Sequence, residues 1–132
     1  MFAKLNTVKI LLCDDNDNFR QLLTQYIHSM PGAEVIGEAI DGVDVIEKTE
    51  SLNPDLVLMD LSMPNQSGLD ATKTIKEKWP KKSVIILTLY EDSVYKELAD
   101  EFHADGFIAK SSIKSQLPVV ISELLNNSEN QN

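Results

Sequence analysis

The sequence predicts an α/β fold, in which a single doubly wound, five-stranded parallel sheet carries helices on both faces. Three observations predict this class. Short apolar runs alternate with amphipathic stretches along the whole chain. Three of the runs are apolar at nearly every position, which is typical of parallel strands covered on both faces. The length of 132 residues suits one domain, and right-handed crossovers then give the usual strand order 2-1-3-4-5.

Each predicted strand is a short apolar or alternating run next to turn-forming residues. The first, third and fourth runs are the nearly continuous ones, and the second alternates only weakly. Pro54 precedes the third run, which fits a strand that begins after a turn. The predicted strands span Val8 to Cys13, Glu34 to Ala39, Leu56 to Met59, Ser83 to Leu87 and Gly106 to Ala109.

The first two helices are predicted from capping residues and from apolar residues at helical spacing. Asp17 can cap the first helix, and Pro31-Gly32 ends it. Asp41 can start a short second helix, with Val43 and Ile46 facing the core. The predicted apolar face of the first helix consists of Phe19, Leu22, Leu23, Tyr26, Ile27 and Met30.

The last three helices show the same kind of pattern. Ser67 starts the third helix and Pro80 ends it, while Asp92 or Ser93 opens the fourth. Pro118 is tolerated in the first turn of the last helix. The inward-facing residues are Leu69, Ala71, Ile75 and Trp79 in the third helix, Val94, Leu98 and Phe102 in the fourth, and Leu117, Val120, Ile121, Leu124 and Leu125 in the last.

Composition limits the classes of function. The net charge of −9 and the lack of a basic stripe argue against direct binding of nucleic acid. No apolar run approaches 20 residues and no signal peptide begins the chain, so we expect a cytoplasmic protein that does not enter a membrane. The single cysteine, Cys13, fits a reducing compartment and a core position. We expect one domain over residues 1–125, followed at 126–132 by a polar tail or the start of a linker.

Polar and charged side chains follow four of the predicted strands. Asp14 and Asp15 follow the first strand, Asp60 the third, Thr88 the fourth and Lys110 the fifth. Because the carboxyl ends of parallel strands meet at one edge of a sheet, these side chains should converge at the switch point of the topology. Lys110 balances only one of the three acids, and the remaining charge sits on hard oxygen ligands. The sequence therefore predicts a site for Mg²⁺, with Mn²⁺ as a second possibility, and no organic cofactor.

Such a site can form an acyl phosphate. A carboxylate next to a divalent metal can attack phosphorus, while an ammonium group and a hydroxyl stabilise the transferred oxygens. A flavodoxin-like cofactor binder shares the fold, but Asp14 and Asp15 would repel the phosphate that its first loop must hold. A dehalogenase-type phosphatase carries Asp-x-Asp, whereas position 62 here is Ser62. The sequence contains neither Gly-x-x-x-x-Gly-Lys nor Gly-x-Gly-x-x-Gly, the glycine-rich motifs that bind nucleotides.

Four stretches together resemble the receiver domain of two-component response regulators over nearly the whole chain. They are ILLCDDN, LVLMDLSMPNQSGLDA, VIILTLYED and ADGFIAKSS. The resemblance implies that Asp60 accepts a phosphoryl group from a sensor histidine kinase. It also implies that Asp14, Asp15, Asp60 and the backbone carbonyl of Ser62 hold Mg²⁺, and that Lys110 binds the phosphoryl group. Thr88, in the third stretch, resembles the family's switch hydroxyl, and Phe107, in the fourth, takes the position of its aromatic switch residue.

The resemblance further implies a conformational switch. Thr88 would move toward phosphorylated Asp60, and Phe107 would turn inward, which alters the surface of the fourth helix, the fifth strand and the last helix. The domain would be a signalling module rather than an enzyme, although it would assist its own phosphotransfer and dephosphorylation. Homodimerisation on phosphorylation and control of transcription through a LuxR-type output domain are expected. The alternatives are an interaction module that works without phosphorylation, and a Phe107 that is simply part of the core.

Overall fold

The structure is a computed structural model that describes residues 6–61, 67–89 and 93–127. Five strands and five α-helices alternate in these ranges, with one 3₁₀ turn before the last helix. The strands are β1 (Val8–Cys13), β2 (Ala33–Ala39), β3 (Leu56–Asp60), β4 (Ser83–Thr88) and β5 (Gly106–Ala109). The helices are α1 (Asp17–His28), α2 (Gly42–Leu52), α3 (Gly68–Lys78), α4 (Ser93–Glu101), the 3₁₀ helix η1 (Lys110–Ser112) and α5 (Ile113–Asn127).

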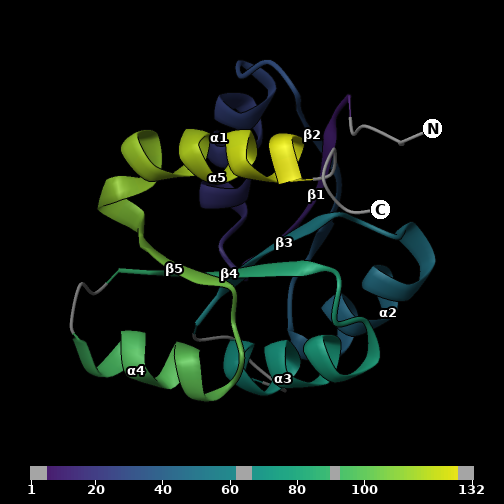
Figure 1. Cartoon of the computed structure of the whole chain (residues 1–132), viewed down its shortest axis with the longest axis vertical. Coiled ribbons are helices and arrows are strands. Elements are labelled where there is room, and N and C mark those ends of the chain that lie inside the picture. Colours follow the sequence, from purple (N-terminus) through teal and green to yellow (C-terminus); the bar gives the residue numbers. More distant parts are fainter. Residues whose placement is uncertain (1–5, 62–66, 90–92, 128–132) are drawn as a thin grey trace.

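The five strands form one parallel sheet in the order β2-β1-β3-β4-β5. Helices α1 and α5 cover one face of the sheet, and α2, α3 and α4 cover the other (Figure 1). The predicted fold class, strand order and helical layers are therefore confirmed. All four crossovers place the carboxyl ends of the strands at the same edge of the sheet, which is where ligand sites of this architecture lie.

Alternate residues of the central strands fill a separate core on each face of the sheet. On β1, Ile10 and Leu12 pack with α1 and α5, whereas Leu11 and Cys13 pack with residues of α2 and α3. Burial of both faces explains why the β1 and β3 runs contain almost no polar residue. The rigid sheet between the two cores fixes the relative positions of the strand ends.

Two details of α1 differ from the sequence prediction. Asn16, not Asp17, caps the helix, because its side chain accepts a hydrogen bond from the Phe19 backbone N–H at 2.9 Å. Asp17 is instead the first helical residue. Leu22 was predicted on the apolar face, but it is 66% exposed, since α1 turns only Leu23 and Ile27 fully into the core.

Helices α2 and α5 also differ in detail. Val43 was predicted to face inward and is 50% exposed, because α2 buries Val45 and Thr49 instead. Pro118 lies inside α5 rather than in its first turn, since the helix begins at Ile113. The helix continues through Asn127 and so includes the first two residues of the predicted tail, while residues 128–132 lie outside the described ranges. Asp92, one predicted start of the fourth helix, also lies outside them.

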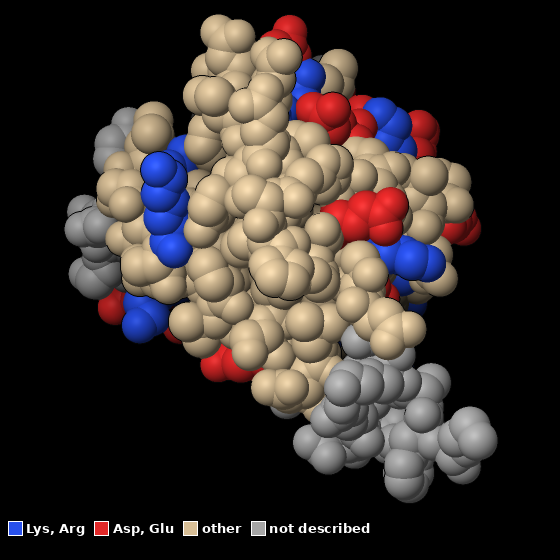
Figure 2. Space-filling view, turned by 90° about the horizontal axis from the view of Figure 1, so that it is seen from above, with Lys and Arg blue, Asp and Glu red and all other residues tan. Residues whose placement is uncertain are grey.

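Charge is unevenly spread over the face that α1 and α5 form. Figure 2 shows the molecule from the side of α1 and α5, where uncharged side chains fill the centre and charged ones lie around the rim. The Lys and Arg residues visible there do not gather into a basic patch. Among the described residues, no helix combines the length and apolarity needed to cross a membrane.

Candidate functional site

The pairing of β1 with β3 brings two of the predicted acids together. Cys13, the last residue of β1, lies opposite Met59 of β3 in the parallel register. Asp14 follows β1 directly and Asp60 is the last residue of β3, so the two acids meet at the carboxyl edge of the sheet. Asp15 follows in the turn before α1. One carboxylate oxygen from each of the three acids lies within 4.8 Å of the other two.

The pairing of β4 with β5 completes the site. Thr88, the last residue of β4, lies opposite Ala109, the last residue of β5, so Lys110 leaves the sheet at the same edge. The Lys110 Nζ atom donates a hydrogen bond to Asp14 Oδ2 at 2.8 Å and lies 3.5 Å from Asp60 Oδ1. The structure thus brings all five described candidates to one edge. Ser62, whose backbone carbonyl was the sixth candidate, lies outside the described residues.

Burial and like charge make ionisation of Asp60 unfavourable. Burial raises the pKa of the Asp60 carboxyl to about 6, and the charges of Asp14 and Asp15 add to the effect. Lys110 acts in the opposite direction but does not cancel it. Three acids and one ammonium group leave an excess of negative charge, which a divalent cation can neutralise. The acid cluster of Asp14, Asp15 and Asp60 could hold a metal ion, because its donors are hard carboxylate oxygens within reach of one ion.

Sequence reasoning missed two residues of α1 that contact this site. The Lys110 ammonium lies 4.1 Å from the centroid of the Phe19 ring, in a cation–π contact. Arg20 donates a hydrogen bond to the main-chain oxygen of Asp14 at 2.6 Å. Phe19 was assigned only to the apolar stripe. For Arg20, the one signal in the sequence was a lone basic residue that follows the acidic stretch Asp14 to Asp17.

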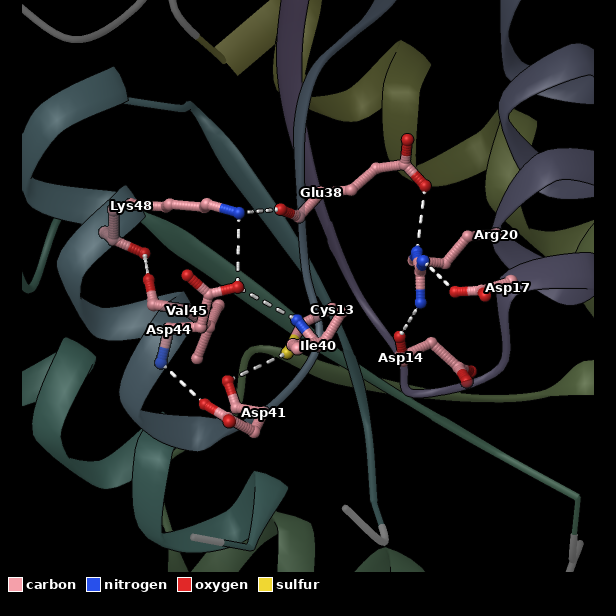
Figure 3. Close-up of polar contacts among 11 residues, drawn as sticks. Cys13, Asp14, Asp17, Arg20, Glu38, Ile40, Asp41, Asp44, Val45 and Lys48 are labelled. Atoms are coloured by element: carbon pink, nitrogen blue, oxygen red, sulfur yellow. Dashed lines mark hydrogen bonds and ion pairs between the residues drawn. The ribbon is translucent and has the colours of Figure 1, made fainter. Parts of the chain in front are cut away.

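Figure 3 shows how Arg20 joins the loop after β1 to its neighbours. Its Nε atom donates to Glu38 Oε1 on β2 at 2.9 Å, and Nη2 pairs with Asp17. Burial lowers the pKa of Arg20, but the hydrogen bonds to Asp17 and Glu38 outweigh this and raise it overall, so the group stays charged. The loop that carries Asp14 and Asp15 is therefore fastened from the side of α1 and β2.

Of the two residues assigned to a switch, Thr88 lies at this edge, whereas Phe107 pairs with Ile86, two residues before the end of β4. Thr88 is 2% exposed at the end of β4. Phe107, on β5, is partly buried against the core on the α2–α4 side. The same residue borders a cavity of about 480 Å³ that β5 and α5 line. The core residues that line this cavity belong to the α5 side of the sheet, whereas the Phe107 ring packs with the core on the other side.

Cys13 behaves as a core residue, as its sequence context predicts. It is 1% exposed, and its thiol donates to the Asp41 main-chain oxygen at 3.6 Å. Burial raises the pKa of the thiol far above its usual range, and the charge of Asp60 acts in the same direction. The thiol is therefore neutral and unsuited to nucleophilic or metal-ligand chemistry.

Comparison with known proteins identifies the family. Residues 10–122 match the model of the response regulator receiver domain. The chain is 34% identical over 122 residues to the response regulator protein VraR of Staphylococcus saprophyticus, which covers 91% of this chain and 57% of that protein. It is 37% identical over 120 residues to a protein-glutamate methylesterase/protein-glutamine glutaminase of Pyrococcus horikoshii, which covers 89% of this chain and 32% of that protein.

Solved structures agree with these sequence matches. A LuxR-family two-component response regulator from an Aurantimonas species superposes with a TM-score of 0.85 at 30% identity, over 92% of this chain and 86% of that one. The response regulator domain of Thermotoga maritima CheB superposes with a TM-score of 0.77 at 31% identity, over 96% and 98% of the two chains. The matched region spans 57% of the length of the first of these curated relatives and 32% of the length of the second. Fold, family model and relatives together place this chain in the family of response regulator receiver domains, the signalling modules of two-component systems.

Proposed function

We propose that this chain is a phosphorylation-activated receiver in which Asp60 accepts a phosphoryl group from a sensor histidine kinase, in a reaction that depends on Mg²⁺. The observation that carries the proposal is the convergence at one sheet edge of Asp60, two further acids and one lysine. Asp60 is the acid at the end of the central strand β3, between the acid pair after β1 and the lysine after β5.

The metal would be held by Asp14, Asp15 and Asp60, with the backbone carbonyl of Ser62 as a further ligand by family resemblance. Mg²⁺ fits this donor set, and Mn²⁺ fits it nearly as well. When bound, the ion supplies positive charge that neutralises oxygens of the transferred group. Lys110, held by Asp14 and by the Phe19 ring, would supply a second positive charge to the transferred group.

In the transfer, one carboxylate oxygen of Asp60 forms a bond to phosphorus as the bond between phosphorus and the donor nitrogen breaks. The electron pair of the broken bond stays on the imidazole of the kinase histidine. The Lys110 ammonium and the Thr88 hydroxyl would donate to the phosphoryl oxygens as charge moves onto them. Asp14 and Thr88 are buried at the floor of the site, whereas Asp15 is exposed and Asp60 partly exposed, so a phosphodonor can reach the phosphoacceptor.

The output of the reaction would be a change of surface. Thr88 would move toward the phosphoryl group, Phe107 would turn into the space left behind, and the α4–β5–α5 surface would change. Control of transcription through an output domain of LuxR type, and a homodimer formed on phosphorylation, are part of the same proposal. So are a cytoplasmic location and a receiver domain at 1–125 that a polar tail or linker follows.

Intact-mass spectrometry tests the proposal. Incubation with Mg²⁺ and a small acyl-phosphate donor should add one phosphoryl group to the wild type, and a chelator should prevent the addition. Asp60→Asn should remain unlabelled. Asp55→Asn is the matched control, because Asp55 immediately precedes β3 at the opposite edge of the sheet, and it should be labelled like the wild type.

Two results would contradict the proposal. Equal labelling of Asp60→Asn would show that another residue accepts the group. A wild type that stays unlabelled with every donor, in the presence of Mg²⁺, would favour the alternative of an interaction module that works without phosphorylation.

A further inference from the structure

We propose that Arg20 is a positioning residue for the metal-binding acids, which it holds in place through the main chain of Asp14. The inference rests on the proposed function, since it concerns the same site. Arg20 touches neither the metal position nor the phosphoacceptor in our assignment. Its role would be to set the direction of the loop from which Asp14 and Asp15 project.

The guanidinium of Arg20 binds three acceptors on three different segments. Nη1 donates to the Asp14 main-chain oxygen at 2.6 Å, Nε donates to Glu38 Oε1 at 2.9 Å, and Nη2 pairs with the Asp17 carboxylate. These acceptors belong to the loop after β1, to the edge strand β2 and to the first turn of α1 (Figure 3). The Arg20 side chain is only 12% exposed, so water competes weakly for these donors.

Only an arginine can make this set of contacts. A guanidinium presents donors in a rigid planar fork, whereas a lysine ammonium is a single point at the end of a flexible stem. A lysine at position 20 would retain the positive charge but could not reach all three acceptors in the same directions. Charge and geometry can therefore be separated by experiment.

Asp15 depends on the main chain for its position. Among the described residues, its carboxylate makes no hydrogen bond or ion pair, and it lies in the turn between Asp14 and Asn16. The Asp14 carboxylate, in contrast, accepts from Lys110 at 2.8 Å and from the Asn16 N–H at 2.8 Å. The hydrogen bond from Arg20 to the Asp14 main-chain oxygen therefore affects above all the direction in which the Asp15 carboxylate points.

A second cation, Lys48, contacts Glu38 only at the Glu38 main chain, which the β1–β2 ladder already positions. Lys48 of α2 donates to the Glu38 main-chain oxygen at 2.5 Å and to Asp44 Oδ2 at 3.1 Å. Asp44 Oδ2 also accepts from the Ile40 N–H at 3.1 Å. Lys48 is thus a second cation in the same network, on the far side of Glu38 from the acid pair, and provides a matched control.

The sign of the change in Mg²⁺ affinity tests the proposal. Loss of a positive charge near three acids should by Coulomb attraction alone strengthen Mg²⁺ binding. Loss of a positioning contact should weaken it, by about tenfold, the lower end of the effect of outer contacts on metal sites. NMR titration with MgCl₂, without any phosphodonor, measures the dissociation constant from amide shifts at the acid cluster. We expect Arg20→Met and Arg20→Lys both to bind about tenfold more weakly than wild type.

Lys48→Met removes the same charge and disturbs the same network, and it should bind Mg²⁺ as the wild type does. Arg20 variants that bind as tightly as the wild type, or more tightly, would overturn the proposal while leaving the proposed function intact. Equal weakening by Lys48→Met would also overturn it, since general loosening would then explain the effect. If Arg20→Met fails to give a folded spectrum, Arg20→Lys decides by the same criterion. A wild type without Mg²⁺ binding at the acid cluster would remove the proposed function itself, and this inference with it.

Discussion

At the scale of single residues, the acid cluster is costly to the fold. Asp60 ends a strand whose other residues are fully buried, and it lies beside the buried Asp14. Burial and the neighbouring acids raise the pKa of Asp60 from its ordinary 3.8 to about 6. A group that resists ionisation in the folded state lowers stability at neutral pH. Such a cost is expected where a residue is retained for its chemistry rather than for packing.

Asp60→Asn should therefore stabilise the metal-free protein. Between pH 3.8 and about 6 the unfolded chain has released the Asp60 proton and the folded chain retains it, so stability falls as pH rises through this window. After allowance for solvent screening, the gain for Asp60→Asn at pH 7 should be about 1–2 kcal/mol, and it should vanish near pH 4. Urea unfolding in EDTA at both pH values measures it. A variant less stable than the wild type at pH 7 would refute this view of the site.

The sequence was most informative for residues at strand ends. Asp14, Asp60, Thr88 and Lys110 could be found because a parallel sheet brings the residues after its strands to one edge. Arg20 could not be found in this way, because its contact is with a main-chain oxygen and depends on how α1 lies against β2.

At the scale of elements, the first residue of α3, Gly68, lies close to the main chain of Asp60. The Gly68 N–H donates to the Leu61 carbonyl at 3.2 Å, and Ser67 caps α3 by accepting from the Asp70 N–H at 3.2 Å. A Cβ atom at position 68 would overlap the main-chain carbonyl oxygen of Asp60. Glycine is thus required here by close approach of two backbones.

Gly68→Ala should destabilise the protein by about 1–3 kcal/mol, because backbone atoms must shift to admit the methyl group. Gly37→Ala is the matched control. Its Cβ would meet the end of the Leu52 side chain, which is 39% exposed and can move aside, so its effect should stay within about 1 kcal/mol. Urea unfolding of both variants provides the comparison. Equal effects of the two substitutions would show that the turn at Gly68 has room to adjust.

The errors at Leu22 and Val43 share one cause. The spacing of apolar residues gave the existence of every helix, but not its rotation against the sheet. Val43 was expected inside and lies outside, whereas Thr49 of the same helix is fully buried with its hydroxyl donating to the Val45 carbonyl at 2.6 Å. A polar side chain whose hydrogen bond is made within its own helix can be buried, but a hydropathy pattern does not predict that burial.

At the scale of the whole molecule, β4 and β5 connect the site to the surface. Thr88 at the end of β4 faces the site edge, and Phe107 on β5 borders the cavity between β5 and α5. Because β4 and β5 are paired strands of one sheet, a displacement of Thr88 can change the space around Phe107 while the strand order stays the same. The proposed switch requires only two arrangements of a few side chains.

A phosphoryl mimic should change this surface. Addition of beryllofluoride and Mg²⁺ should shift amide resonances from Thr88 to Leu117, and not only those near Asp60. Burial of the rest of the Phe107 ring should add about 1 kcal/mol to the activated state, since part of the ring is already covered. Asp60→Asn should show none of these shifts. Shifts confined to the loops around the acid cluster in the wild type would exclude the switch.

The central claim is that Asp60 forms an acyl phosphate, and reductive trapping tests it most directly. Borohydride reduces an aspartyl phosphate to homoserine with loss of the phosphate, which leaves a permanent mark in the peptide. After phosphorylation in Mg²⁺ and reduction, peptide mass spectrometry should find homoserine at position 60, with Asp14 and Asp15 unchanged. Homoserine at position 14 or 15, or a phosphorylated protein that borohydride leaves unaltered, would contradict the account.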